Sequence, residues 1–566
     1  MSTEPAAQSR AIQFAALEGA ADLFTPDFVR FLTYVNQRFT PLIHELRQKR
    51  AEVLKLAHAG NQPRQFPLSI EAAADWRVLW VPEDLKRPGI EISGPASVTG
   101  MFINALNPGP DGVRAEGDLD DDEDSAGHRF EDTVRAAWNR KGAVERTLTY
   151  KDEKKGKTYR IAEGELPFFM HRERGIHLDE PDVTIGGRPV PASILGTALT
   201  LFHAGRAQVE RGQGIYFYLP KLESAAEAKY WRDFFQAAQE QVPFLKNAVI
   251  RAVLLIESLP AAYQMEEMLF ALGPYAAGLN AARWDFKASL LEFVMNDPAS
   301  VWPDRFGVDI KTTDFLANIF RRLVAVCLKR GAVPIGGMAT ALPSKDDEVN
   351  KAAAAAIRTD KEWEARQGFL RGWVAHIFHM KTAGDPFRQL RGSGWKPTRE
   401  MAEPENYPVR IGVPAGPITL AGTRRNARML VEYLEGWLNG RGAKGIDSLA
   451  GKPGIHPALM EDLATARISV AQIAQRIRHR VRCTDSADVH DFPLAKRLLQ
   501  EETQDIVAHL RGAPADEDNA GAEESYQKAC KISLQWVQNY VNLDFRSLGS
   551  YTRRQLDEIA GRPDAF

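Results

Sequence analysis

Two carboxylates follow predicted strands at the point where each strand ends. Glu257 comes directly after the apolar run that ends at Ile256, and Asp285 follows the run 277–284. The carboxyl ends of the strands in a parallel barrel meet at one end, so the two side chains are expected to converge there. Converging carboxylate oxygens suit Mg²⁺, a hard cation that takes oxygen ligands. On position alone, however, a helix N-cap or a salt bridge explains each carboxylate better than a metal does.

Arg174 and Asp462 are two further side chains whose types suit catalysis. Arg174 lies beside Gly175, and a guanidinium next to a glycine can approach an oxyanion closely and bind it with two hydrogen bonds. Asp462 precedes an apolar helical run, where a carboxylate is placed to act as a general base. Taken singly, a surface arginine and a helix cap are the simpler explanations of these two residues.

The acidic run at 118–124 resembles the start of a calcium-binding loop. Its acidic residues and Glu131 fall at the ligand positions of such a loop, but Ser125 stands where the loop requires glycine. No amphipathic helix precedes the run, so an EF-hand is rejected. We expect residues 116–124 and 513–523 to be exposed.

The elements that must position these residues alternate between short apolar strands and longer helices from about 90 to 390. Repeated strand–helix units with buried strands indicate a parallel sheet, and their number favours a (β/α)₈ TIM barrel over a doubly wound sheet. The expected strands are 214–220, 248–256, 277–284, 333–338 and 373–377, and the expected helices are 223–241, 261–272 and 313–330.

Helical regions are expected on both sides of the barrel. The first is a helix at 24–58, with apolar residues at helical spacing after Pro26. After about 420 the chain is again helical in pattern, at 424–438, 469–482, 493–511 and 522–541, with a loop at 440–457. We therefore predict an N-terminal helical clasp domain at 1–88, the barrel at 89–395 and a C-terminal helical domain at 396–566.

Composition excludes several classes of protein. The 566 residues include 44% hydrophobic and 26% charged residues, and the net charge of −2 creates no global field for nucleic acid or an anionic membrane. Three scattered cysteines suit a reducing compartment, and no secretory signal or peroxisomal address is recognised. We expect a cytoplasmic protein that binds neither nucleic acid nor membrane. Whether it is a monomer or a small homo-oligomer stays open.

Taken together, the motifs resemble those of the malate synthases of the A type. The resemblance rests first on residues 256–267 (IESLPAAYQMEE) and 277–286 (AGLNAARWDF), with 172–178 (RERGIHL) before them and 459–469 (LMEDLATARIS) after them. Shorter matching segments lie in the same order at 91–95, 103–107, 121–125, 303–305, 329–331, 336–339 and 343–347. The resemblance covers nearly the whole chain, and its motifs are specific as a set.

The resemblance implies a barrel enzyme of the glyoxylate bypass that condenses acetyl-CoA with glyoxylate, in the presence of Mg²⁺, and hydrolyses the product to malate and CoA. It assigns the metal to Glu257 and Asp285, enolate stabilisation to Arg174, and the general base to Asp462 in the C-terminal domain. Asp121 and Glu123 match acidic residues near the metal.

The chain also departs from the family pattern around the presumed substrates. Ala282 replaces a glycine in a run that continues with Arg283 and Trp284, and residues 369–377, which include Trp373, lose an Asp and a Pro. These four named residues match positions near the substrate. Two alternatives therefore stay open: a related enzyme for another acyl-CoA or 2-oxoacid, such as a malyl-CoA or citramalyl-CoA lyase, and a non-catalytic paralogue.

Overall fold

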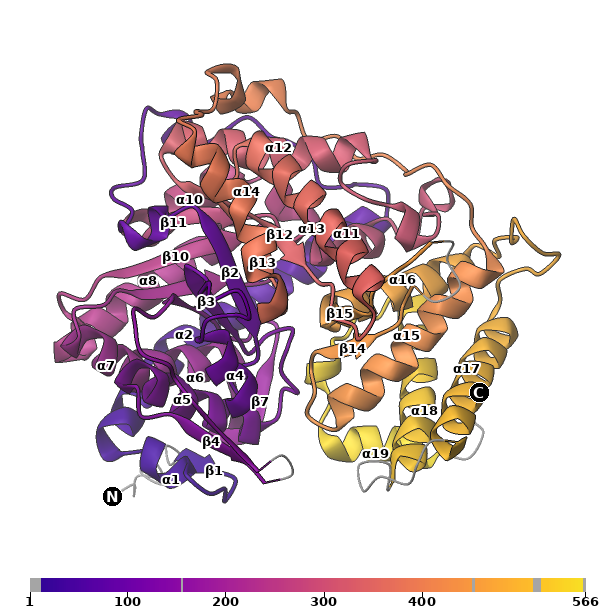
Figure 1. Ribbon diagram of the computed structural model, residues 1–566, viewed down its shortest axis with the longest axis horizontal. Helices are drawn as coiled ribbons and strands as arrows, with labels where there is room; N and C mark the ends of the chain where they lie inside the picture. Colours follow the sequence, from indigo (N-terminus) through magenta and orange to yellow (C-terminus); the bar gives the residue numbers. More distant parts are fainter. Residues whose placement is uncertain (1–11, 154–155, 450–453, 513–520, 563–566) are drawn as a thin grey trace, which may run out of the picture.

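The computed structural model describes residues 12–153, 156–449, 454–512 and 521–562. Its centre is a closed barrel of eight parallel strands, flanked by a long N-terminal helix and a C-terminal group of helices (Figure 1). The predicted (β/α)₈ barrel with helical regions on both sides is confirmed.

Every neighbouring pair of barrel strands is parallel, and the barrel closes where the last strand pairs with the first. Alternate side chains along each strand point inward and form an apolar interior that includes Tyr218, Val253 and Leu255. In barrel order, the strands are β2 (Gly89–Gly94), β3 (Gly117–Asp121), β6 (Phe168–Arg172), β9 (Ile215–Leu219), β10 (Ile250–Leu255), β11 (Ala276–Asn280), β12 (Val333–Ala339) and β13 (Arg371–Val374).

Helices cover the outside of the barrel and return the chain from one strand to the next. They are α4 (Thr99–Ala105), α5 (Phe130–Glu145), α6 (Ala192–Leu199), α7 (Gly205–Glu210), α8 (Ala225–Gln241), α9 (Leu259–Ala262), α10 (Met265–Leu272), α11 (Arg283–Phe293), α12 (Asp314–Arg330), α13 (Asp347–Gln367) and α14 (Met380–Gly392). Their inner faces pack with strand residues in one large apolar cluster and two smaller ones.

The long N-terminal helix α2 (Pro26–His58) lies across the barrel helices α6 and α8. Thr25 caps its first turn and Pro26 occupies the first helical position, where a missing backbone N–H costs nothing. Near its end, Arg50 donates to Glu227 at 2.6 and 2.8 Å and to the carbonyl of Lys221. This helix therefore braces the loop that follows strand β9.

The C-terminal helices form a separate bundle, here called the plug domain, which packs on the barrel through α16 and α11 (Figure 1). The bundle contains α15 (Leu420–Leu438), α16 (Leu463–Arg478), α17 (Phe492–Gly512), α18 (Ala522–Val541) and α19 (Arg553–Gly561). Its strand β15 (Leu459–Glu461) is attached to the segment after β12 by backbone hydrogen bonds, 2.7 Å from Met460 N to Thr340 O and 2.9 Å from Leu342 N to Ala458 O. The start of α16 is thereby held at the carboxyl end of the barrel.

The structure corrects several sequence-based expectations. The expected strand 277–284 ends at Asn280, and α11 begins at Arg283, so Asp285 lies in the first turn of a helix. The loop expected at 440–457 contains strand β14 (Lys444–Ile446), paired with β15; residues 450–453 lie outside the described part.

The acidic run was also wrongly expected to be exposed. Residues 117–124 are buried, because Arg140 and Arg172 supply counter-charges inside the fold. The second such run, at 513–523, lies mostly outside the described residues.

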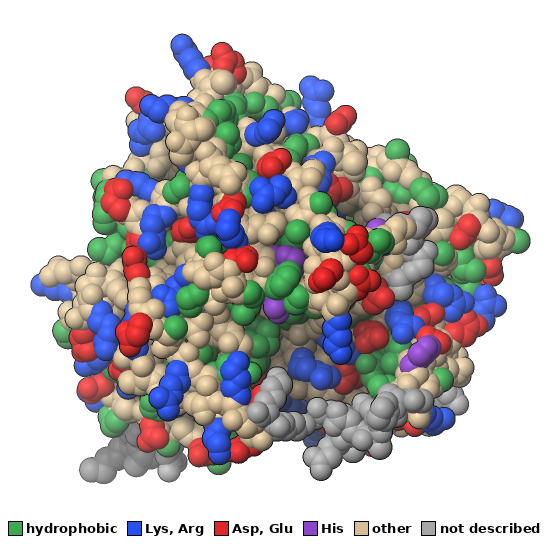
Figure 2. All heavy atoms as spheres, viewed as in Figure 1, with side chains coloured by type: hydrophobic (Ala, Val, Ile, Leu, Met, Phe, Trp, Pro, Cys, Tyr) green, Lys and Arg blue, Asp and Glu red, His purple; other side chains and the backbone are tan. Residues whose placement is uncertain are grey.

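Within the described residues, no helix combines the length and the apolar character that crossing a bilayer requires. Figure 2 shows basic and acidic side chains intermingled over the visible face, with no large patch of one sign.

Candidate active site

Three carboxylates converge at the carboxyl end of the barrel. Asp124 follows β3, Glu257 follows β10, and Asp285 lies in the first turn of α11, just after β11. All three are buried, and each offers a carboxylate oxygen within 4.8 Å of the other two. The predicted convergence of Glu257 and Asp285 is thus present, with Asp124 as a third member.

The three carboxylates surround one ammonium group. Lys221, in the loop after β9, places its Nζ 2.9 Å from Asp124, 2.7 Å from Asp285 and 3.8 Å from Glu257. Burial alone would lower the pKa of Lys221, but these charges outweigh it and raise the pKa. The position of the ammonium marks the point where the carboxylates favour positive charge.

The donor set fits a hard divalent cation. Glu257 Oε1 accepts a hydrogen bond from the backbone N–H of Lys221, whereas its buried Oε2 has no hydrogen-bond partner among the described residues. A buried, unpartnered carboxylate oxygen is costly unless a ligand satisfies it. Burial, together with Asp285 and Asp124, holds the pKa of Glu257 well above its usual range, which a bound cation would reverse.

The pKa of Asp285 is shifted in the opposite direction to that of Glu257. Its burial would raise its pKa, but Lys221 and Arg467 outweigh that effect and the pKa is lowered. Arg467, which comes from α16 of the plug domain, donates to Asp285 Oδ1 at 2.8 Å. Asp285 therefore stays ionised and links the barrel to the plug domain.

Asp462 reaches this cluster from the plug domain. It is the N-cap of α16: its Oδ1 accepts from Thr465 N at 3.2 Å, and its own backbone N–H donates to Thr465 Oγ1 at 3.1 Å. The next residue, Leu463, lies with its backbone N 3.5 Å from the carbonyl of Asp124. Burial and the charges of Asp124 and Asp285 hold the pKa of Asp462 well above its usual range. It therefore caps a helix and also stands beside the carboxylates as a strengthened base.

The arginine at the cluster is Arg172, not Arg174. Arg172 is the last residue of β6 and faces the barrel interior, where it donates to both oxygens of Asp121 at 2.7 and 2.6 Å and lies 3.2 Å from Asp124. Arg174 lies in the turn after the strand and donates to Glu180 at 2.6 Å and to Thr133 at 2.9 Å. The guanidinium of Arg174 thus bonds to Glu180 and Thr133, whereas Arg172 pairs with Asp121 and Asp124.

Asp121 and Glu123 adjoin the cluster and shape the loop that carries Asp124. Asp121 accepts from Ser125 N at 3.0 Å and Ser125 Oγ at 2.6 Å in addition to Arg172, so its oxygens are fully used in shaping the loop that carries Asp124. Burial would raise the pKa of Asp121, but Arg172 lowers it on balance. Glu123 accepts from Gly175 N at 2.5 Å, which ties this loop to the turn after β6.

The four residues predicted to lie near the substrate take different positions. Ala282 precedes α11 and packs against the apolar interior of the barrel. Arg283 donates to Asp360 at 3.0 Å and to the carbonyl of Met338 at 2.8 Å, and the ring of Trp284 lies 4.5 Å from Lys287 Nζ. Trp373 lies next to Arg172, since its ring is 5.5 Å from the Arg172 guanidinium.

A polar layer below Arg172 fixes this ring. Trp373 Nε1 donates to Glu91 Oε2 at 3.2 Å and to Tyr218 Oη at 3.1 Å, and Tyr218 in turn donates to Glu91 at 2.6 Å. Arg371 completes the layer with a 2.8 Å bond to Glu91. Barrel interiors are usually apolar, and here the mutual hydrogen bonds of Glu91, Tyr218 and Trp373 hold the three side chains in one arrangement.

A cavity of about 280 Å³ opens beside the cluster and is lined there by Glu257 and Lys221. It extends from Glu257 and Lys221 between α2 and the plug domain to the segment after α18, which includes Arg546. The site therefore has a space beside it that small molecules can occupy.

Sequence reasoning did not single out Asp124, Arg172 or Lys221. Asp124 and Arg172 lie within motifs already quoted for the resemblance. The motifs therefore contained these residues, but they did not show which side chains point into the site. Arg172 could have been identified as the end of the apolar strand Phe168–Arg172, since strand ends point into such sites. Lys221 follows the strand Ile215–Leu219 in the same way.

Comparisons with known proteins place relatives of this chain in one family. Residues 168–403 match the family model "Malate synthase, TIM barrel domain", and residues 417–553 match "Malate synthase, C-terminal". The chain is 34% identical to a malate synthase of Streptomyces clavuligerus (98% of this chain, 99% of the relative) and 33% identical to malate synthase A of Escherichia coli K12 (97% and 99%). Among solved structures, a Haloferax volcanii malate synthase magnesium/glyoxylate complex is 13% identical, with a TM-score of 0.41, over 78% of this chain and 98% of that one.

Proposed function

Since the chain belongs to the malate synthase family, and is therefore an enzyme of the acyltransferase type, we propose specific roles for its barrel-end residues in joining acetyl-CoA to glyoxylate. The observation that carries the proposal is the meeting of two parts: the barrel supplies the three carboxylates, and the plug domain supplies Asp462 beside them. Neither part has the complete set of groups alone.

Asp462 is the general base that takes a proton from the methyl group of acetyl-CoA. A thioester methyl proton is weakly acidic, so the base must be both positioned and stronger than an ordinary carboxylate. The capping bonds from Thr465 fix its orientation, and the raised pKa of Asp462 increases its affinity for the proton. The backbone of α16 thus orients the base as well as carrying it.

Arg172 supplies positive charge where the enolate oxygen develops. Its guanidinium is buried, and its bonds to Asp121 hold it in place before any charge forms. A preorganised cation in a water-poor site stabilises a developing oxyanion more than solvent does. Arg174, which pairs with Glu180, has no such position and serves the fold of the turn.

Asp124, Glu257 and Asp285 would hold Mg²⁺, and Lys221 would share the same negative field. When bound, Mg²⁺ supplies positive charge that orients glyoxylate and polarises its aldehyde. The enolate carbon then attacks the aldehyde carbon, and hydrolysis of the resulting thioester by water releases malate and CoA. The contact between α16 and α11 brings the base Asp462 close to the part of the barrel that would hold glyoxylate.

The domain boundaries at 88 and 395 and the cytoplasmic location stay predictions. Whether the protein is a monomer or a small homo-oligomer stays open.

The direct test is the reaction itself. Purified protein with Mg²⁺, acetyl-CoA and glyoxylate should release free thiol, and malate should accumulate in equal amount. Omission of glyoxylate separates condensation from plain thioester hydrolysis. No thiol release with glyoxylate, but release with another 2-oxoacid, would establish the alternative of a related condensing enzyme; no release with any acceptor would contradict catalysis.

A further inference from the structure

We propose that Arg467 is a positioning residue that fixes helix α16, and with it the base Asp462, against helix α11, which carries the cation ligand Asp285. The inference rests on the proposed function and deepens it. It concerns how the two halves of the site are held at their working separation.

Arg467 joins the two helices through three groups of bonds. Its Nη1 donates to Asp285 Oδ1 at 2.8 Å, its Nη2 donates to the two oxygens of Glu292 at 2.8 and 3.0 Å, and its Nε donates to Glu292 Oε1 at 3.3 Å. Asp285 and Glu292 are seven residues apart on α11, so they share one face of that helix. One planar guanidinium therefore spans two turns of α11.

Arg467 lies close to Asp462 along α16, so its contact with α11 also holds Asp462 in place. Asp462 caps the helix and Arg467 lies in the second turn, so an anchor at Arg467 also anchors the cap. Asp285, at the start of α11, is the other residue whose place the guanidinium fixes. Displacement of a reacting group by about 1 Å can lower the rate about a hundredfold, so this spacing has catalytic weight.

A third element supports the contact. Tyr540 of α18 donates from its Oη to Glu292 Oε1 at 2.7 Å, and both side chains are buried. Burial would lower the pKa of Arg467, but Glu292 and the neighbouring charges raise it well above its ordinary value. The guanidinium stays charged, and its partners are held in fixed orientations.

The chain offers a matched control on the same helix. Arg478 lies in the last turn of α16 and also bridges to the barrel, with Nη2 2.5 Å from Asn296 Oδ1, but it is sixteen residues from Asp462 and has no bond to a cation ligand. It tests whether any arginine bridge between the domains has the same effect.

The experiment compares Arg467→Met/Glu292→Gln, Glu292→Gln, Arg467→Lys and Arg478→Met with the wild-type protein. The double substitution removes both charges, so no buried ion is left without a partner and folding is preserved. We expect its kcat for thiol release to fall about 10- to 100-fold. Arg478→Met should keep the wild-type kcat. The kcat values of Glu292→Gln and Arg467→Lys should lie between those of the wild-type protein and the double variant, because each substitution keeps part of the contact with Asp285.

Calorimetry of Mg²⁺-dependent glyoxylate binding separates positioning from general damage. The double variant should bind as tightly as wild type or more tightly, because Asp285 loses a competing positive charge. Amide hydrogen exchange at 463–467 should be faster in the double variant and unchanged in Arg478→Met.

Three results would overturn the inference: wild-type kcat in the double variant, a parallel loss of kcat and of glyoxylate binding, or unchanged exchange at 463–467. Failure of the wild-type protein to release thiol would instead contradict the proposed function, while the exchange measurement would still decide whether Arg467 holds α16.

Discussion

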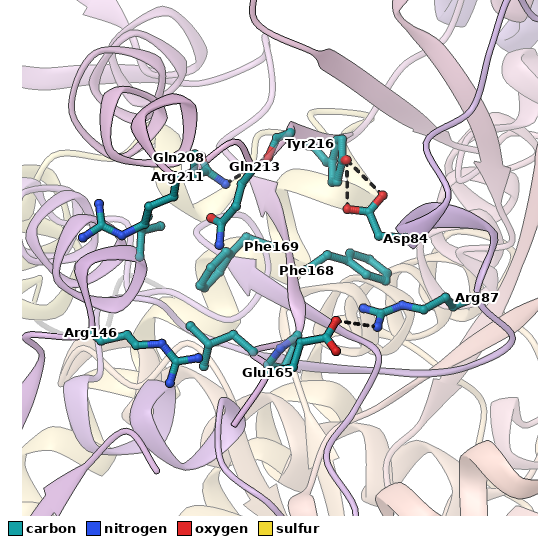
Figure 3. A pocket seen from close by; sticks show the side chains of 14 residues that line it. Asp84, Arg87, Arg146, Glu165, Phe168, Phe169, Gln208, Arg211, Gln213 and Tyr216 are labelled. Atoms are coloured by element: carbon teal, nitrogen blue, oxygen red, sulfur yellow. Dashed lines mark hydrogen bonds and ion pairs between the residues drawn. The ribbon is translucent and has the colours of Figure 1, made fainter. Parts of the chain in front are cut away.

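Ionisable side chains line both ends of the barrel, and their arrangements differ. At the amino end, a pocket of about 290 Å³ is bordered by pairs of complementary groups (Figure 3). Tyr216 donates to both oxygens of Asp84 at 3.0 and 2.9 Å, and Arg87 lies 3.0 Å from Glu165. Each polar group named here has its own partner within the protein.

At the carboxyl end, like charges are brought together instead. Asp124, Glu257 and Asp285 crowd around one lysine, and Glu257 Oε2 has no hydrogen-bond partner among the described residues. Gathering carboxylates raises the free energy of the folded protein, as the raised pKa of Glu257 records. The difference teaches that separate complementary pairs stabilise a fold, whereas several carboxylates that share one lysine, with one oxygen left without a hydrogen-bond partner, indicate a site for a ligand.

The largest effect should come from the base. Asp462→Asn should lower kcat on the order of 10²–10⁴-fold, because the amide cannot accept the methyl proton, while Mg²⁺-dependent glyoxylate binding is kept. Thiol release and calorimetry check the two parts. In the wild-type protein, kcat/KM for acetyl-CoA should fall as pH is lowered through the raised pKa of Asp462, since the base is then protonated. An asparagine variant with wild-type turnover would remove Asp462 from the mechanism.

The next largest effect should come from the carboxylates. Glu257→Gln and Asp285→Asn should each weaken Mg²⁺ binding and glyoxylate binding together, because few protein ligands remain to hold the cation. Calorimetry with and without glyoxylate measures both. If either variant kept wild-type affinity for Mg²⁺ and glyoxylate, the cation would have to lie elsewhere.

Arg172 and Arg174 allow the same comparison within one short segment, because Arg172 lies at the carboxylate cluster and Arg174 pairs with residues outside it. Arg172→Lys should lower kcat by about 100-fold, as expected for loss of a preorganised oxyanion donor. Arg174→Lys should chiefly lower the melting temperature, because Arg174 bonds to Glu180 and Thr133 and not to the cluster. Steady-state kinetics and thermal unfolding of both variants measure these effects. A large loss of kcat in Arg174→Lys, with kcat kept in Arg172→Lys, would identify Arg174 as the catalytic arginine.

A smaller effect is expected at Ala282. Its methyl group packs against the barrel interior just before α11, three residues from Asp285. Ala282→Gly should improve kcat/KM for glyoxylate, by up to about tenfold if the methyl costs about one kcal/mol or slightly more in acceptor binding. An unchanged or higher KM for glyoxylate would show that the methyl group of Ala282 does not limit glyoxylate binding. Residues 369–377 would then be the better explanation of any altered substrate preference.

The smallest effect on activity should come from the amino end. Tyr216→Phe removes the hydroxyl that bonds to Asp84 and should lower the free energy of unfolding by about 0.5–1.5 kcal/mol, with kcat unchanged. Denaturant unfolding and thiol release measure the two quantities. A tenfold loss of kcat would show that the two ends of the barrel are coupled and would break the comparison.

Much of this architecture followed from the sequence because it depends on local patterns. Strand and helix periodicity placed the barrel, and the strand ends placed Glu257 and Asp285 together. The boundary at Ala282 was misjudged because an apolar run does not show where a chain leaves a sheet, and only the first turn of α11 fixes Asp285.

The rest of the site depends on distant pairing. In the register of β3 and β6, Asp121 lies opposite Arg172, so part of the acidic run is paired with an arginine that lies 51 positions away. That pairing also places Arg172 beside Asp124, whereas Arg174 pairs with Glu180. The role of Arg467 depends on the packing of two domains, which single-helix patterns do not contain.

The central claim is that the plug domain's Asp462 removes the proton while the barrel holds the acceptor. Proton exchange measures this step without the rest of the reaction. With Mg²⁺ and oxalate, an analogue of glyoxylate that cannot condense, the wild-type protein in D₂O should exchange the methyl protons of acetyl-CoA, followed by proton NMR. Asp462→Asn should show no exchange under conditions where calorimetry confirms that oxalate is bound. Exchange at the wild-type rate in that variant would contradict the account.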